Sequence, residues 1–141
     1  MHDLRLIRED PEGFDAGLAR RGADPVAARI LELDERRRAV TTKVQEAQAR
    51  RNEASKAIGA AMGKGDAATA DALKAEVAAL KETLPRLEDE EHALAAELDA
   101  LVAALPNIPA EDVPAGADES GNVEVSRWGQ QRNFAFEPRE H

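Results

Sequence analysis

This chain of 141 residues contains no cysteine and no tyrosine, and aromatic residues make up only 3% of it. The absence of cysteine excludes disulfides and thiolate metal sites, and it agrees with a cytoplasmic location. With so few aromatic residues and 33% charged residues, the chain cannot build a large globular core. It also lacks the apolar run of a signal peptide, and no stretch is apolar enough to span a membrane.

The sequence lacks the common motifs of catalysis as well. It has no glycine-rich phosphate loop, no nucleophile elbow and no pair of carboxylates placed for acid–base chemistry. The three histidines are scattered at His2, His92 and His141, so they do not form a metal-binding pattern. We therefore assign no catalytic, cofactor-binding or metal-ligating residue, and we expect the chain itself not to be an enzyme and to need no cofactor.

What the sequence has instead is one regular repeat between residues 26 and 105. Apolar residues recur there in steps of three and four, the 3.5-residue period of a left-handed coiled coil. The first seam is Ile30, Leu33, Arg37, Val40, Val44, Ala47, Arg51, Ala54, Ile58 and Ala61, and the second is Leu73, Val77, Leu80, Leu84, Leu87, Glu91, Leu94, Leu98, Leu101 and Leu105. This pattern predicts two long helices that pack along their seams.

The short segment 62–66 between the seams predicts a tight reversal. Gly63 can adopt the left-handed conformation that ends a helix, and Asp66 can cap the next one. Folding at this turn pairs residues whose numbers sum to about 131, and this single register satisfies every layer of the seam. The predicted fold is therefore all-α, a long antiparallel two-helix coiled-coil hairpin, which we call the arm.

The segments on either side of the arm predict smaller elements at its base. Residues 1–25 form a helical foot, in which Asp10 and Pro11 start a helix that runs to about Arg21, and Asp24 caps the long helix that follows. Residues 106–141 are rich in proline and form a loop, followed by a short strand at 122–128. The chain ends without a cap or a closing strand, which suggests a link to a further domain that is absent here.

The two halves of the arm differ in their seams. Leucine, isoleucine and valine face one another near the base, whereas Ala47, Arg51 and Ala54 occupy the seam of the distal half. Less apolar area is buried there, so we expect the distal half to be looser. Pro85 falls on the outer face of the second helix, where it should bend the helix.

The net charge of −9 argues against a nucleic-acid partner only if the charges are evenly distributed. In the predicted register Lys43 faces Glu90 and Arg36 faces Glu97, so these cations are neutralised. The seam residue Arg37 should likewise pair with Glu91.

Basic residues nearer the turn lack such partners across the arm. In the same register Arg50 faces Thr83, Lys81 faces Gln48, and Lys74 faces Ser55. The cations of the distal arm are Arg50, Arg51, Lys56, Lys64, Lys74 and Lys81. Because no aromatic platform accompanies them, they suit the phosphates of an RNA duplex better than single strands, and we predict that they bind RNA.

Several short motifs resemble the N-terminal arm of bacterial seryl-tRNA synthetases. Two of them are specific loop sequences outside the repeat, Pro-Asn-Ile-Pro at 106–109 and Arg-Trp-Gly at 127–129. The others are Asp3-Leu-Arg-Leu-Ile-Arg-Glu-Asp-Pro11, Leu33-Asp-Glu-Arg-Arg37, Arg51-Asn-Glu-Ala-Ser-Lys56 with Ile58-Gly59, Val113-Pro114, and Asn122-Val-Glu-Val-Ser. The resemblance covers essentially the whole chain in order.

The resemblance implies a role in recognising tRNA. In that family the arm projects from a class II synthetase and holds the long variable arm and elbow of serine tRNA without reading the anticodon. It implies serine tRNA as the partner, with selenocysteine tRNA as a second candidate. The parent enzyme would be a homodimer that uses ATP and Mg²⁺ in a catalytic domain following residue 141, whereas this chain alone would be a monomer.

A structural adaptor that docks on protein helices is the alternative. Such an adaptor should expose an apolar stripe outside the seam, and mainly alanine occurs there. The sequence therefore favours the tRNA-binding arm.

Overall fold

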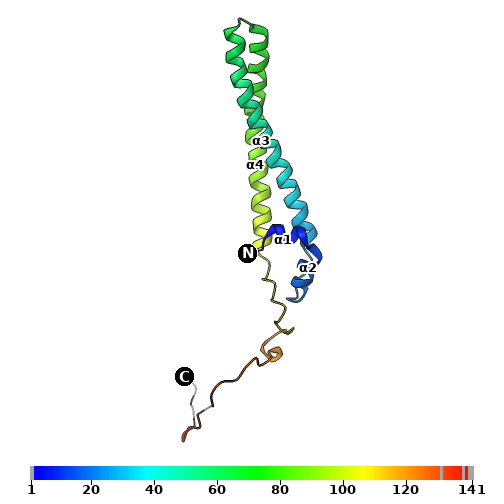
Figure 1. Ribbon diagram of the computed structural model, residues 1–141, viewed down its shortest axis with the longest axis vertical. Helices are drawn as coiled ribbons and strands as arrows, with labels where there is room; N and C mark the ends of the chain where they lie inside the picture. The colour runs from blue at the N-terminus through cyan, green and yellow to red at the C-terminus, as the bar shows by residue number, and fades with distance from the viewer. Residues whose placement is uncertain (1, 131, 138, 140–141) are drawn as a thin grey trace. The chain divides into compact units, whose positions relative to one another are not determined.

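The computed structural model describes residues 2–130, 132–137 and 139, and this part of the chain is helical, without strands (Figure 1). Its elements are α1 (Leu4–Glu9), α2 (Pro11–Ala19), α3 (Ala27–Gly63), α4 (Ala67–Ala103) and the 3₁₀ helix η1 (Glu119–Gly121). The chain divides into two compact units, Met1–Pro109 and Ala110–His141. No helix in the described part combines the length and hydropathy that a membrane span requires.

Helices α3 and α4 lie side by side and run in opposite directions (Figure 1). Each has 37 residues, so each is about 55 Å long. Every position of the two predicted seams is buried or half-buried. The prediction of an all-α antiparallel hairpin is therefore confirmed.

The hydrophobic core occupies the lower part of this hairpin and the foot. A single cluster joins Ile7 and Leu18 of the foot to Leu33 and Leu98 of the arm, and it extends up the arm only as far as Val44 and its neighbours. Farther towards the turn, the buried apolar side chains of the described residues are the alanines Ala54, Ala61 and Ala70. The core thus thins towards the turn, as the seam residues predict.

The foot contains one helix more than the sequence predicted. The carboxylate of Asp3 accepts a hydrogen bond from the backbone N–H of Arg5 and caps α1, whose Ile7 is 1% exposed. A helix of six residues is too short to show a helical period in the sequence. The predicted start of α2 is confirmed, because Asp10 accepts a hydrogen bond from the N–H of Gly13.

The predicted start of the long helix was wrong. Asp24 does not cap it, and α3 begins at Ala27 after Val26, which provides no side-chain cap. Instead, Asp15 of α2 accepts hydrogen bonds of 2.9 Å from the backbone N–H groups of Val26 and Ala27. The negative charge of this carboxylate also interacts favourably with the dipole of α3 at its N-terminus. Because Asp15 belongs to α2, its two hydrogen bonds join the foot to the arm.

The turn at the tip reverses the chain as predicted, but a different glycine adopts the left-handed conformation. Gly65, not Gly63, has the positive φ of 73°. The N–H of Asp66 bonds to the carbonyl of Ala61 and that of Gly65 bonds to the carbonyl of Met62, which is the Schellman pattern. The left-handed residue therefore lies two positions later than predicted, and α3 continues through Gly63.

Asp66 caps α4 as predicted. Its carboxylate accepts hydrogen bonds from the hydroxyl and the backbone N–H of Thr69, at 2.7 and 3.1 Å. These two bonds, the hydroxyl bond first, lower the pKa of Asp66. The cap therefore stabilises the turn at neutral pH, and this contribution is lost as the pH falls through the lowered pKa.

The predicted strand at 122–128 does not form. Residues 122–128 contain no hydrogen-bonded ladder, and Val125 and Trp128 are 97% and 99% exposed. A strand needs a neighbouring strand to pair its backbone groups, and the described residues supply none. The alternation of apolar and polar residues is compatible with an extended backbone, but it does not form a strand without a partner.

Pro85 lies exposed within α4, on the outer face as predicted, and the helix continues through it. Its ring leaves the carbonyl of Lys81 without an intrahelical N–H partner. The bend that we expect at this point stays a prediction.

The thinning of the core predicts a gradient of local stability. We expect amide hydrogen exchange to be faster in residues 47–84 than in residues 30–44 and 87–101, because small residues fill the distal seam. Hydrogen exchange of the free chain, followed by NMR or mass spectrometry, measures this directly. Equal protection along both helices would contradict the prediction.

Candidate nucleic-acid interface

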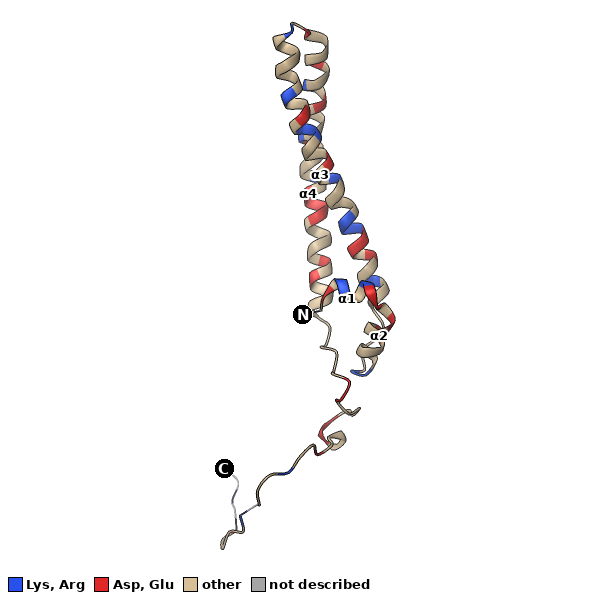
Figure 2. Ribbon diagram, in the orientation of Figure 1, with Lys and Arg blue, Asp and Glu red and all other residues tan. Residues whose placement is uncertain are grey.

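All six predicted RNA-binding cations lie on α3, on α4 or at the turn between them (Figure 2). The six cations differ in whether an acidic side chain neutralises them. Two of them bind carboxylates, and four make no hydrogen bond or ion pair through their side chains within the described residues.

Arg50 is held by two glutamates, which corrects the prediction that it lacks an acidic partner. Its Nη2 donates to Oε2 of Glu76 at 2.8 Å across the arm, and its Nη1 donates to Oε2 of Glu53 at 3.1 Å. The predicted neighbour Thr83 bonds to the carbonyl of Ala79 instead. The hydrogen bonds with Glu76 and then Glu53 raise the pKa of Arg50, and the same bond with Arg50 lowers the pKa of Glu76.

Lys74 also has an acidic neighbour, although on its own helix. Its Nζ donates to Oδ1 of Asp71 at 3.0 Å. Ser55, which was predicted to face it, donates its hydroxyl to the carbonyl of Arg51. This exposed pair, one turn apart on α4, is weak, so Lys74 is only partly neutralised.

The remaining four predicted cations have no partner within the part of the chain that the structure describes. Lys56, Lys64 and Lys81 are exposed, and Arg51 is half-buried in the seam. Their charges therefore remain available to an external anion.

Two pairs predicted near the base of the arm are absent. Glu97, the predicted partner of Arg36, binds Arg29 instead, at 2.6 Å. Lys43, which was predicted to pair with Glu90, has no ion pair within the described residues. The predicted bond between Arg37 and Glu91 is also wrong, because Glu91 accepts a hydrogen bond from the hydroxyl of Thr41.

Sequence reasoning missed a repeated arrangement of charges on one flank of the arm. Arg29 binds Glu32 on its own helix and Glu97 across the arm. Arg50 binds Glu53 and Glu76 in the same way, 21 residues farther along α3 and 21 residues earlier in α4. We call these two groups of three residues the arginine clasps. Their signal is a glutamate three residues after an arginine that flanks the seam.

Sequence reasoning also assigned no role to Asp34, which is 2% exposed. Its two carboxylate oxygens accept hydrogen bonds from Nη1 of Arg8 at 2.7 Å and from Nη2 of Arg37 at 3.3 Å. Because Arg8 belongs to α1, this buried carboxylate connects the foot to the arm. Nε of Arg37 is buried there without a hydrogen-bond partner.

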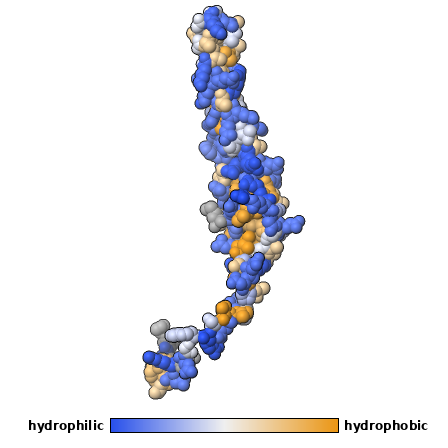
Figure 3. All heavy atoms as spheres, viewed as in Figure 1, coloured by the Kyte–Doolittle hydropathy of each residue, from blue (hydrophilic) through white to orange (hydrophobic). Residues whose placement is uncertain are grey.

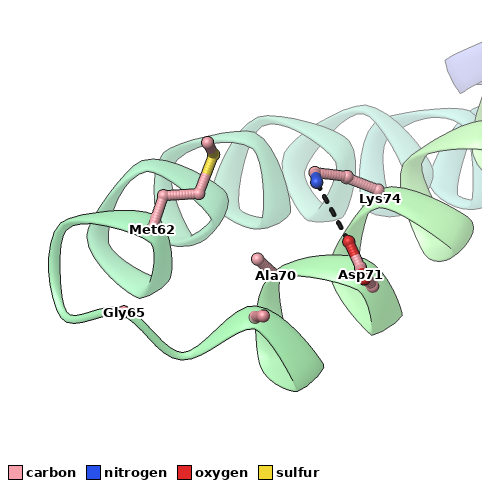
Figure 4. A pocket seen from close by; sticks show the side chains of 6 residues that line it. Met62, Gly65, Ala70, Asp71 and Lys74 are labelled. Atoms are coloured by element: carbon pink, nitrogen blue, oxygen red, sulfur yellow. Dashed lines mark hydrogen bonds and ion pairs between the residues drawn. The ribbon is translucent and has the colours of Figure 1, made fainter.

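A shallow pocket of about 230 Å³ lies beside the turn. Figure 4 shows Met62 and Lys74 near it, and the ion pair of Lys74 with Asp71 at its rim. It is lined by Met62, Gly65, Ala67, Ala70, Asp71 and Lys74. Within the described residues, no group of acidic, histidine or cysteine side chains could hold a metal ion.

The face of the hairpin shown in Figure 3 is mainly hydrophilic towards the turn, and its hydrophobic residues show mostly over the lower part. This face therefore does not present the continuous apolar stripe that an adaptor would need. The distal arm offers charged and polar contacts instead.

Comparisons with known proteins give one consistent family. Residues 1–109 match the family model described as the seryl-tRNA synthetase N-terminal domain. The chain is 70% identical over all its 141 residues to a serine–tRNA ligase of Novosphingobium aromaticivorans, and 67% identical to one of Erythrobacter litoralis. In both cases the chain spans only 33% of the length of the relative.

A solved structure gives the same answer for the fold. The crystal structure of seryl-tRNA synthetase from Pyrococcus horikoshii complexed with ATP resembles this chain with a TM-score of 0.78 and 32% sequence identity. The likeness covers 92% of this chain and 29% of that one.

Proposed function

Since this chain belongs to the seryl-tRNA synthetase N-terminal domain family, we propose that its arm binds the tRNA of a serine–tRNA ligase. The arm grips the long variable arm and elbow of serine tRNA through its shape and through contacts to the sugar–phosphate backbone. Such contacts position an RNA without reading its bases.

The observation that carries this proposal is the set of four unpartnered cations in the distal arm. Lys56, Lys64, Lys81 and Arg51 have no acidic partner within the described residues, so a phosphate can bind them without first displacing a carboxylate. Arg50 and Lys74, which the sequence placed in the same set, must exchange a glutamate or an aspartate for a phosphate. We therefore assign these two a smaller share of the binding.

The longer protein would supply the chemistry. We propose that it joins serine to tRNA, as the names of the relatives indicate, and that it uses ATP and Mg²⁺ to activate the serine. In a homodimer, the arm of one subunit would present the tRNA to the active site of the other. Selenocysteine tRNA, which would need the same grip on a long variable arm, is a second RNA to test.

The proposal predicts a loss of RNA affinity when the unpartnered lysines are neutralised. Replacing Lys56, Lys64 and Lys81 together by alanine should weaken the binding of serine tRNA to this chain. The slope of log K against log salt should also become smaller by roughly 0.7–0.9 for each phosphate that the variant no longer binds. Fluorescence anisotropy with labelled tRNA over a salt series measures both quantities.

The matched control replaces two cations that already have partners. Arg50→Ala with Lys74→Ala should change affinity and salt slope less, since carboxylates partly neutralise both side chains. A serine tRNA that lacks its long variable arm should bind the unaltered chain weakly. If the chain binds neither RNA, or binds both equally well, the proposal fails and the adaptor alternative gains support.

A further inference from the structure

We infer that the RNA backbone lies along one particular side of the distal arm, which carries Lys74 and Lys81, and not along the opposite side with the arginine clasps. This inference rests on the proposed function and names the surface that performs it. We call the two surfaces the lysine side and the clasp side.

The bonds across the arm define the two sides. On the clasp side Arg29 and Arg50 of α3 bind Glu97 and Glu76 of α4. On the other flank of the seam, Nε2 of Gln48 donates to Oε1 of Glu88 at 3.1 Å. In a coiled coil, residues seven apart lie on the same flank.

Counting in steps of seven residues from Gln48 and Glu88 towards the turn identifies the other residues of the lysine side. These steps lead from Gln48 to Ser55 on α3, and from Glu88 to Lys81 and then Lys74 on α4. From Lys81 to the start of α4 this strip is about 20 Å long, so it can follow several successive phosphates of one strand.

Charge makes the clasp side a poor surface for RNA. Each arginine clasp combines one guanidinium with two carboxylates, so each carries a net negative charge. The donor groups of Arg50 are already directed at Glu76 and Glu53. A phosphate approaching this side meets two glutamates and one occupied arginine.

The lysine side has the opposite character. Lys81 has no partner within the described residues, and Asp71, which binds Lys74, is the one acid that α4 places on the strip between Lys81 and the turn. The exposed neutral side chains Gln45 and Asn52 lie on the same flank of α3. Amide groups can bond to phosphate oxygens and to ribose 2′-hydroxyls.

The strip also lacks any means of holding unstacked bases. Residues 45–85 contain no aromatic side chain, and proteins that bind single strands rely on such side chains for stacking. The expected ligand of the lysine side is therefore the sugar–phosphate edge of a double-stranded segment.

A pair of matched charge reversals tests which side is used. Lys81→Glu changes the lysine side, and Arg86→Glu makes the same change of charge on the clasp side, since Arg86 shares its face of α4 with Thr83 and Glu90. Both side chains are exposed and unpartnered within the described residues. Lys81→Glu should weaken the binding of serine tRNA about tenfold, whereas Arg86→Glu should change it less than about twofold.

Binding is measured for this chain by anisotropy at one fixed salt concentration, with circular dichroism to confirm that each variant is helical. Lys81→Ala is the milder second variant, and it should give a smaller loss in the same direction. A larger loss for Arg86→Glu, or equal losses for both reversals, would overturn the assignment of the side while the proposed function stands. If the unaltered chain itself does not bind serine tRNA, the proposed function fails as well.

Discussion

Leu33→Ala is expected to reduce the free energy of unfolding of this chain by about 3 kcal/mol. Leu33 is 0% exposed and belongs to the cluster that joins the foot to the two helices of the arm. The substitution removes buried methyl groups and leaves a cavity that long, stiff helices can close only in part. Urea unfolding followed by circular dichroism gives the free energy from the shifted midpoint.

An exposed leucine of the foot provides the matched comparison. Leu6 is 62% exposed, so Leu6→Ala should cost less than about 1 kcal/mol. A similar loss for both variants would show that the base of the arm does not form the tightly packed core described above. A change in the slope of the transition would show that the variant alters the surface exposed on unfolding or that unfolding is not a single step.

Asp34→Asn should have the second largest effect, a loss of about 2 kcal/mol. The asparagine fits the space but cannot neutralise the guanidinium groups of Arg8 and Arg37, and one of its atoms becomes a donor that faces other donors. The side chains of the two arginines are 40% and 37% exposed, so water partly compensates them and keeps the loss below that of a fully buried pair.

This substitution should also loosen the attachment of α1 (Leu4–Glu9). Amide exchange in α1 should accelerate more than in the middle of α4, because Arg8 loses its bond to the arm. The neighbouring substitution Glu35→Gln is the control, since Glu35 is exposed and makes no ion pair within the described residues. If Asp34→Asn and Glu35→Gln have the same small effect, the buried carboxylate does not fasten the foot.

The hairpin could be predicted from the sequence because its cause is local and repeated. Each apolar residue of the seam follows the last by three or four positions, and a two-helix register that fits one layer fits all of them. Asp66 could be predicted for a similar reason, because it caps a group only three residues away.

The beginning of α3 could not be predicted in this way. Asp24 stood at the correct distance for a cap, yet the bonds go to Asp15, which belongs to a different helix. A contact of this kind depends on how α2 packs against α3, and a local pattern carries no information about that packing.

The partners of the cations were mispredicted for a different reason. The register gives the neighbours of a residue at the level of the backbone, whereas an arginine reaches along the flank. Arg50 therefore passes the level of Thr83 and binds Glu76, one heptad nearer the turn. Four of the six distal cations lack a partner within the described residues, as the sequence predicted, but Arg36 and Lys43 nearer the base lack one too, whereas Arg50 and Lys74 have one.

The arginine clasps have a consequence for how an arm of this kind can change its reach. They recur after 21 residues on both helices, so three seven-residue modules separate them and both flanks keep the same phase. Removing one module from each helix would shorten the arm by about 10 Å and leave the seam and both flanks in phase. Removing a number of residues that is not a multiple of seven would rotate the turn about the long axis, and the lysine side would face a different direction. The length of the arm can therefore change in steps of about 10 Å without changing the direction in which its two flanks face.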